Sequence, residues 1–184
     1  MTIRPTRITA GPRLAALSDW LLARAGWRCA GAPPARGGWV AIGAPHTSNW
    51  DFCLMLALAL RHRLRVVWLG KHSLFRGPLG WLLRWLGGVP VDRTRANGLV
   101  DTAVEAFRTH EDLILVLAPE GTRARGACWK TGFWRIADAA GVPIVLGYVD
   151  WRRRIVGLGP AFVTTGDMDA DLAAIRAFYR PYER

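Results

Sequence analysis

Short apolar segments alternate with longer segments of helical character along the whole chain, and turn residues bound them. The clearest apolar run, Leu113–Leu117, has the length of a buried strand. Strands are expected at residues 39–42, 65–69, 89–91, 113–117 and 142–149. Helices are expected at residues 12–25, 50–60, 78–86, 97–109, 131–140 and 167–179. This alternation predicts an α/β fold with a mixed, mainly parallel sheet flanked by helices.

The length of the chain suits a single domain of this class. With 184 residues and 51% apolar side chains it can bury one hydrophobic core, and disorder is excluded. We predict an N-terminal amphipathic helix and a connecting segment in residues 1–36, followed by the α/β domain in residues 37–184. The longest unbroken apolar run, Phe52–Leu60, has nine residues, whereas a spanning helix needs about 20. With no visible secretory signal, the expected location is the cytoplasm.

Charge and tryptophan content indicate the kind of partner. The net charge is +11, and the chain contains 10 tryptophans. A positive surface favours nucleic acid, anionic lipid headgroups or phosphorylated substrates, and Trp together with Arg suits a membrane interface. The helices at 12–25 and 78–86 carry both residue types, so we predict peripheral binding to the inner face of a membrane. For helix 78–86 the alternative is that its leucines face the core, and a nucleic-acid-binding module is the rival for the whole chain.

The three cysteines do not indicate a metal or disulfide site. They are widely spaced, odd in number, and in no CxxC or Cys/His pattern: Cys29, Cys53 and Cys128. We therefore expect reduced thiols, no metal and no cofactor.

The segment His46–Asp51 places an imidazole and a carboxylate five residues apart. Side chains meet on one helix at spacings of three or four, so His46 is expected in a loop before the helix. Asp51, in the first helical turn, can then reach back to His46. A carboxylate bonded to one imidazole nitrogen leaves the other nitrogen to take a proton, which predicts a general-base pair. The alternative is that Asp51 only complements the helix dipole and His46 is a surface loop residue.

Polar segments that follow two other predicted strands contain arginines, Arg93 and Arg123. The chain has no GxSxG or SxxK nucleophile motif, so an enzyme with this base would activate a hydroxyl of its substrate. The guanidinium groups are candidates for bidentate phosphate binding. The alternative is that they pair with the neighbouring Asp92 and Glu120 as structural ion pairs.

Taken together, these segments resemble the glycerophospholipid acyltransferases, the lysophosphatidate acyltransferase family. The His-x4-Asp of His46 and Asp51, the Gly-x-Pro-Val-Asp-Arg ending at Arg93 and the Glu-Gly-Thr-Arg of residues 120–123 occur in the family's order. The resemblance implies that His46 is the catalytic base and that Asp51 orients it. It implies an acceptor-binding role for six further residues: Lys71, Arg93, Glu120, Gly121, Thr122 and Arg123.

The resemblance also implies a reaction. An O-acyltransferase of this family moves a fatty acyl group from a thioester to the free hydroxyl of a lysophospholipid such as 1-acyl-glycerol-3-phosphate. The donor would be acyl-CoA or acyl-carrier-protein, which is a co-substrate and not a cofactor. Another lysophospholipid or a lyso aminolipid is the alternative acceptor. The expected setting is phospholipid biosynthesis at a membrane surface with anionic lipids.

Overall fold

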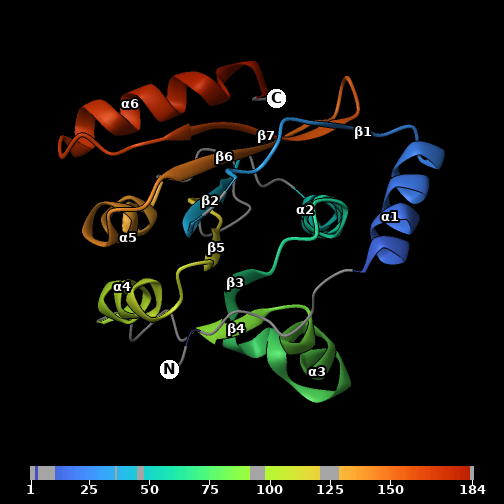
Figure 1. The fold of residues 1–184 in the computed structure, drawn as a ribbon, viewed down its shortest axis with the longest axis horizontal. Coiled ribbons are helices and arrows are strands. Elements are labelled where there is room, and N and C mark those ends of the chain that lie inside the picture. Colours follow the sequence, from blue (N-terminus) through green and yellow to red (C-terminus); the bar gives the residue numbers. More distant parts are fainter. Residues whose placement is uncertain are drawn as a thin grey trace.

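The computed structural model describes residue 3 and residues 11–35, 37–44, 48–91, 98–120 and 129–182. Within these residues a seven-stranded sheet runs through the middle of the molecule, with helices on both faces (Figure 1). The strands lie in the order β1-β7-β6-β2-β5-β3-β4. This confirms the predicted α/β class.

The strand directions create one edge where most strands end. The strands are β1 (Arg28–Ala30), β2 (Trp39–Gly43), β3 (Val66–Lys71), β4 (Gly88–Val91), β5 (Ile114–Leu117), β6 (Ile144–Asp150) and β7 (Ile155–Phe162). β6, β2, β5, β3 and β4 pair in parallel, whereas β7 runs antiparallel to β6 and β1 runs parallel to β7. The C-terminal ends of these five parallel strands therefore lie side by side, and we call this side of the sheet the carboxyl edge.

Six α-helices within the described residues cover the two faces of the sheet. They are α1 (Pro12–Arg24), α2 (Asn49–Arg61), α3 (Gly77–Trp85), α4 (Leu99–Thr109), α5 (Gly132–Ala140) and α6 (Met168–Tyr179). A short 3₁₀ turn, η1 (His72–Phe75), leads from β3 into α3, and another, η3 (Arg180–Tyr182), follows α6. α1, α2 and α3 lie on one face, and α4, α5 and α6 lie on the other (Figure 1). Among these helices, none is both long and apolar enough to cross a bilayer.

Alternating strand residues build a separate core on each face. Val40 and Ile42 of β2 pack with the face covered by α4, α5 and α6. Ala41, between them, packs with the face covered by α1 and α2. Successive side chains of a strand point to opposite faces, so strands covered on both faces are apolar throughout, which explains the unbroken apolar runs of the sequence.

Two strands were not predicted, β1 and β7. β1 lies in the segment expected to connect the N-terminal helix to the domain, and it pairs with β7. β7 contains Gly157, Gly159 and Pro160, which disfavour strand assignment. The two glycines make room for aromatic rings, because a Cβ would lie 2.8 Å from Tyr148 at Gly157 and 2.4 Å from Phe178 at Gly159. Their place in the strand thus depends on tertiary packing.

α3 contacts the body of the protein through a glycine. Gly80 is the buried residue of this helix, and a Cβ there would lie 2.2 Å from the Phe75 backbone. Leu79 and Leu82 are exposed. The interpretation that these leucines face the core is therefore wrong for both of them.

Candidate active site

Three of the predicted site residues lie at the carboxyl edge. Asp51 is in the first turn of α2, which follows β2. Lys71 is the last residue of β3, and Glu120 comes three residues after the end of β5. The remaining predicted residues lie outside the described part of the chain: His46, Arg93, Gly121, Thr122 and Arg123. Their roles stay predictions.

Asp51 is positioned by the start of α2. Ser48 is the N-cap, with extended backbone angles (φ −142°, ψ 156°), and its N–H donates to Asp51 Oδ2 at 2.7 Å. In return the Ser48 Oγ accepts from Trp50 N–H at 3.2 Å. This reciprocal pair is a capping box, which satisfies N–H groups that have no partner within the helix. Local sequence therefore places the carboxylate at this helix start.

The second oxygen of Asp51 is held by a residue from another part of the chain. The side chain of Asp51 is 6% exposed, and Trp151 Nε1–H donates to its Oδ1 at 3.0 Å. Trp151 directly follows β6, so it also lies at the carboxyl edge. Trp151 was not among the predicted site residues. The available signal was an indole N–H two residues after the predicted strand 142–149.

The capping role and the proposed catalytic role of Asp51 are compatible. Asp51 does complement the N-terminus of α2, as the helix-dipole alternative holds. Each carboxylate oxygen can accept two hydrogen bonds, so a carboxylate that accepts from Ser48 and Trp151 can also accept from an imidazole N–H. The pairing of Asp51 with His46 stays a prediction.

The backbone brings the other candidate segments near one another. Lys71 is in register with Val91, two residues before Arg93 in the chain, so β3 ends beside the strand that leads to Arg93. The Lys71 side chain is exposed, and Glu120 is half-buried. Lys130 N–H donates to Pro119 O at 2.8 Å. This hydrogen bond joins the residues on either side of segment 120–129, which contains Glu120 and Arg123.

Two other groups of polar residues lie away from the carboxyl edge. A depression of about 580 Å³ lies at the opposite edge, where β3 and β5 begin; its lining includes Arg63, Arg65, His110 and Asp112. His62, at the C-terminal end of α2, is half-buried, and burial together with the nearby Arg61 charge lowers its pKa. Over the described residues, no group of three His, Cys, Asp or Glu side chains could hold a metal ion.

Comparisons with known proteins agree with the geometry. The chain is 36% identical over 109 residues to the 1-acyl-sn-glycerol-3-phosphate acyltransferase of Escherichia coli, an alignment that covers 55% of this chain and 43% of that protein. The corresponding protein of Salmonella typhimurium is 35% identical over the same length and with the same coverage. The aligned region thus spans less than half the length of these curated relatives.

A solved structure shares the fold. The crystal structure of the 1-acyl-sn-glycerophosphate (LPA) acyltransferase, PlsC, from Thermotoga maritima is similar with a TM-score of 0.60 and 16% identity, covering 94% of this chain and 80% of that chain. The family model described as Acyltransferase matches residues 33–146, which is more than half of the sequence. These findings confirm the resemblance seen in the motifs, and the chain belongs to the Acyltransferase family.

Proposed function

We propose that this chain transfers a fatty acyl group from a thioester to the free hydroxyl of a lysophospholipid. The relatives named above are 1-acyl-sn-glycerol-3-phosphate acyltransferases, which makes that lysophosphatidate the favoured acceptor. The observation that carries the proposal is the buried Asp51 carboxylate. It is held from two directions at the carboxyl edge, within the His-x4-Asp segment of a family member.

The proposed chemistry needs no covalent enzyme intermediate. The acceptor hydroxyl oxygen attacks the thioester carbonyl carbon while His46 takes the hydroxyl proton. The C–S bond then breaks, and the leaving thiolate receives the proton from His46. Asp51 orients the imidazole and stabilises the imidazolium that forms. Such a base contributes about 10² to 10⁴ in rate.

The developing oxyanion requires separate hydrogen-bond donors. Two N–H groups at the start of α2, those of Ser48 and Trp50, are engaged within the capping box. The donors to the oxyanion would therefore come from other backbone N–H groups of the loop or from an arginine, and one such donor is worth about 10² to 10³ in rate. Arg93 and Arg123, with Lys71 and the Glu120–Thr122 segment, would hold the acceptor phosphate.

The reaction is tested with a matrix of thioester donors and lyso acceptors. Acyl-CoA and acyl-carrier-protein are each offered with lysophosphatidate, other lysophospholipids and a lyso aminolipid, and the His46→Ala variant serves as the blank. We expect transfer to lysophosphatidate that the His46→Ala variant loses while its circular dichroism spectrum is unchanged. In the Arg123→Ala variant, we expect mainly a higher KM for phosphate-bearing acceptors. Equal transfer by wild type and His46→Ala would reject the base assignment.

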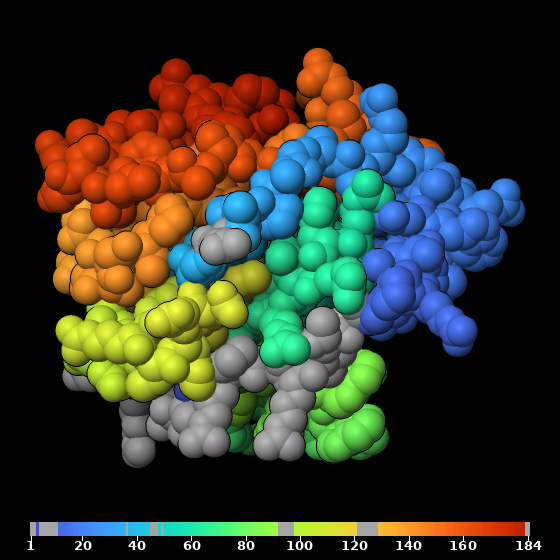
Figure 2. Space-filling view, viewed as in Figure 1, coloured from blue at the N-terminus to red at the C-terminus, as the bar shows by residue number. Residues whose placement is uncertain are grey.

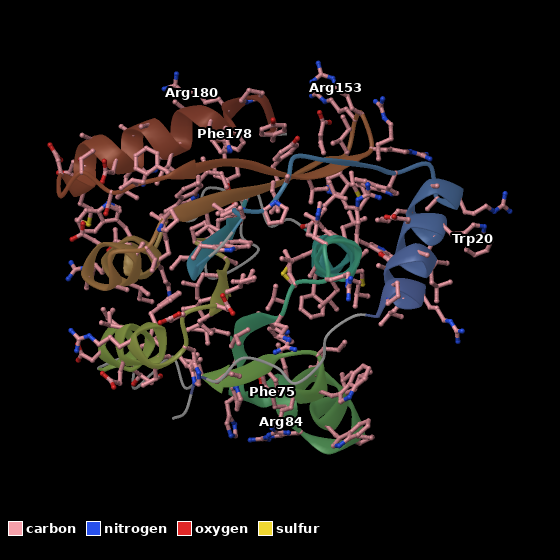
Figure 3. The ribbon with its side chains drawn as sticks, viewed as in Figure 1. Trp20, Phe75, Arg84, Arg153, Phe178 and Arg180 are labelled. Carbon is pink, nitrogen blue, oxygen red and sulfur yellow. The ribbon has the colours of Figure 1, made fainter. Side chains whose placement is uncertain are left out.

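The proposed site of action is a membrane surface, because exposed apolar side chains gather on one side of the molecule. Of the large apolar side chains exposed in the described residues, all but Val163 lie between residues 14 and 85. They come from α1, the start of α2, η1 and α3: Leu14, Leu17, Trp20, Leu21, Trp50, Leu74, Leu79, Trp81, Leu82 and Trp85. Figure 2 shows α1 forming one flank of the molecule, and in Figure 3 the labelled Trp20 points away from the body.

Arginines accompany these apolar side chains. Arg13 and Arg24 on α1, and Arg76 and Arg84 at α3, are exposed. Exposed Trp and Leu enter the headgroup region of a bilayer, while guanidinium groups contact lipid phosphates. The other helical face, formed by α4, α5 and α6, contributes no large exposed apolar side chain among the described residues.

Vesicle sedimentation tests this docking surface. Wild type is expected to sediment with vesicles that contain phosphatidylglycerol, and a Trp81→Ala/Trp85→Ala variant is expected to bind at least about tenfold more weakly. The control is Val163→Ala, which removes a side chain of similar exposure outside the cluster. Equal binding by the double variant would contradict the proposal. Stronger retention on single-stranded nucleic acid than on vesicles across a salt series would favour the nucleic-acid alternative.

A further inference from the structure

We infer that Trp151 is a positioning residue for the reaction, because it fixes the plane of the Asp51 carboxylate. This inference rests on the proposed function. Trp151 does not need to touch either substrate, since its indole N–H donates to Asp51 Oδ1 at 3.0 Å and acts through that carboxylate. The two residues are 100 positions apart in the sequence and meet at the carboxyl edge.

The cap of α2 does not by itself require this hydrogen bond. In the capping box the Ser48 N–H occupies Oδ2 of Asp51, and this bond alone permits rotation of the carboxylate about the N–H···O direction. The donor on Oδ1 comes from the β6–β7 turn, a different element. Two donors on two oxygens define the orientation of the carboxylate plane. An imidazole bonded to Asp51 therefore meets an acceptor whose direction is already set.

Trp151 is itself firmly held. Its ring packs edge-on against Trp27, with the centroids 4.9 Å apart and an interplanar angle of 86°. The turn that follows is closed by Asp150, whose Oδ1 accepts from the N–H groups of Arg152 at 3.0 Å and Arg153 at 2.9 Å. At the far side of the turn, Arg28 N–H donates to Arg154 O at 2.9 Å. A donor on a rigid support keeps its hydrogen bond throughout the proton transfer.

The hydrogen bond also sets how strongly Asp51 attracts an imidazolium. An N–H donor withdraws negative charge from the carboxylate. Its removal strengthens the attraction of Asp51 for a protonated His46, so the imidazole stays protonated, and inactive as a base, up to a higher pH. The acid limb of the variant's activity profile should therefore move to higher pH. The lower kcat has a separate cause, which is that Asp51 no longer holds the imidazole in one fixed direction.

The other charged groups of the β6–β7 turn are the same in wild type and variant, so they do not cause a difference between the two pH profiles. Asp150 pairs with Arg153 at 3.5 Å, and the Arg154 guanidinium donates to Ala25 O. In Figure 3, the labelled Arg153 extends outward from the tip of the turn. These groups and the neighbouring Arg28 and Arg152 are present in both wild type and a Trp151 variant, so a difference between the two proteins reflects the change of the indole at residue 151.

The test compares Trp151→Phe with Trp134→Phe in the full chain. Both substitutions keep an aromatic ring and remove an indole N–H that donates to a buried aspartate, since Trp134 Nε1–H donates to Asp171 Oδ2 at 2.8 Å. Rates are measured per folded molecule, with lysophosphatidate and acyl-CoA from pH 5 to pH 9. For Trp151→Phe we expect kcat to fall about three- to tenfold with KM nearly unchanged, and the acid midpoint to rise by about 0.3 to 0.5 pH unit.

The Trp134→Phe variant is the control for kcat and for the pH profile. Trp134→Phe is expected to lose stability but to keep the wild-type kcat and pH profile. If Trp151→Phe also keeps both, or if it loses kcat to the same extent as Trp134→Phe with no change of pH profile, Trp151 is structural and the inference is wrong. If wild type itself transfers no acyl group in any donor and acceptor pair, the failure lies with the proposed function.

Discussion

Asp51 and Asp171 are two buried carboxylates near the start of a helix, and each accepts a hydrogen bond from an indole N–H. They lie at opposite edges of the sheet. α2 follows β2 at the carboxyl edge, whereas α6 follows β7, which runs antiparallel to β6 and so ends at the other edge. The same arrangement, an indole N–H that donates to a buried aspartate, thus occurs once beside the candidate motifs and once far from them.

The remaining partners of the two carboxylates differ. Asp171 also accepts from Thr165 N–H at 2.9 Å and from Thr165 Oγ1–H at 2.8 Å. Burial alone would raise the pKa of Asp171, but these bonds and the one from Trp134 outweigh it and lower the pKa. Asp171 ties a loop and α5 to α6, and it has no histidine near it in the sequence. Location, and not the hydrogen bond itself, makes Asp51 the candidate for proton transfer.

The strongest way to separate the two sites is to neutralise each carboxylate. Asp51→Asn should lower the rate of acyl transfer about 10² to 10⁴-fold, because a neutral amide neither fixes the imidazole tautomer nor stabilises an imidazolium. Steady-state assays with lysophosphatidate measure this loss, and urea unfolding checks that the variant is folded. A rate within about threefold of wild type would remove Asp51 from the mechanism.

At the other edge the same kind of change should affect stability and not chemistry. Asp171→Ala leaves the N–H groups of Thr165 and Trp134 without their acceptor, and buried donors without a partner cost about 1 to 3 kcal/mol each. We expect the free energy of unfolding to fall by about 3 kcal/mol in urea titrations. Activity per folded molecule should stay at the wild-type level, and a selective loss of kcat would contradict the division of roles.

The lowered pKa of Asp171 predicts how acid acts on the fold. Its folded-state pKa lies below the usual value of 3.8, so the unfolded chain takes up a proton first as the pH falls. The stabilisation is therefore complete above about pH 4 and is lost as the pH falls through the folded-state pKa. Urea titrations at pH 7 and near pH 3 should show a smaller stability difference between wild type and Asp171→Ala at the lower pH. A constant difference would contradict the pKa direction.

The smallest effects are expected from the indole donors. Trp134→Phe and Trp151→Phe should each lower the free energy of unfolding by about 1.5 to 3 kcal/mol, since each removes a hydrogen bond to a charged group. Thermal melts of the two variants should therefore look similar. A loss for Trp151→Phe that exceeds the loss for Trp134→Phe by more than about 2 kcal/mol would indicate that the β6–β7 turn is mainly a structural support.

Much of the fold could be predicted because it depends on local pattern. The apolar runs that became β2, β5 and the first half of β6 are covered on both faces, so they are apolar without interruption. β7 could not be predicted, because its glycines are explained by the rings of Tyr148 and Phe178 that lie over them. Pro160 is tolerated there because β1 pairs only with Ile155–Gly157, so no β1 acceptor faces its missing N–H.

By itself, the sequence determined the alternation of strands and helices, the helix start that carries Asp51, and the order of the family motifs. Each strand, each helix start and each motif taken singly depends on residues within a few positions of one another. Only the tertiary structure decided which side chain holds the second oxygen of Asp51 and which helices expose their apolar residues. Those outcomes follow from the parallel pairing of β2 with β6 and from the close approach of α3 at Gly80, contacts between distant segments that no local pattern encodes.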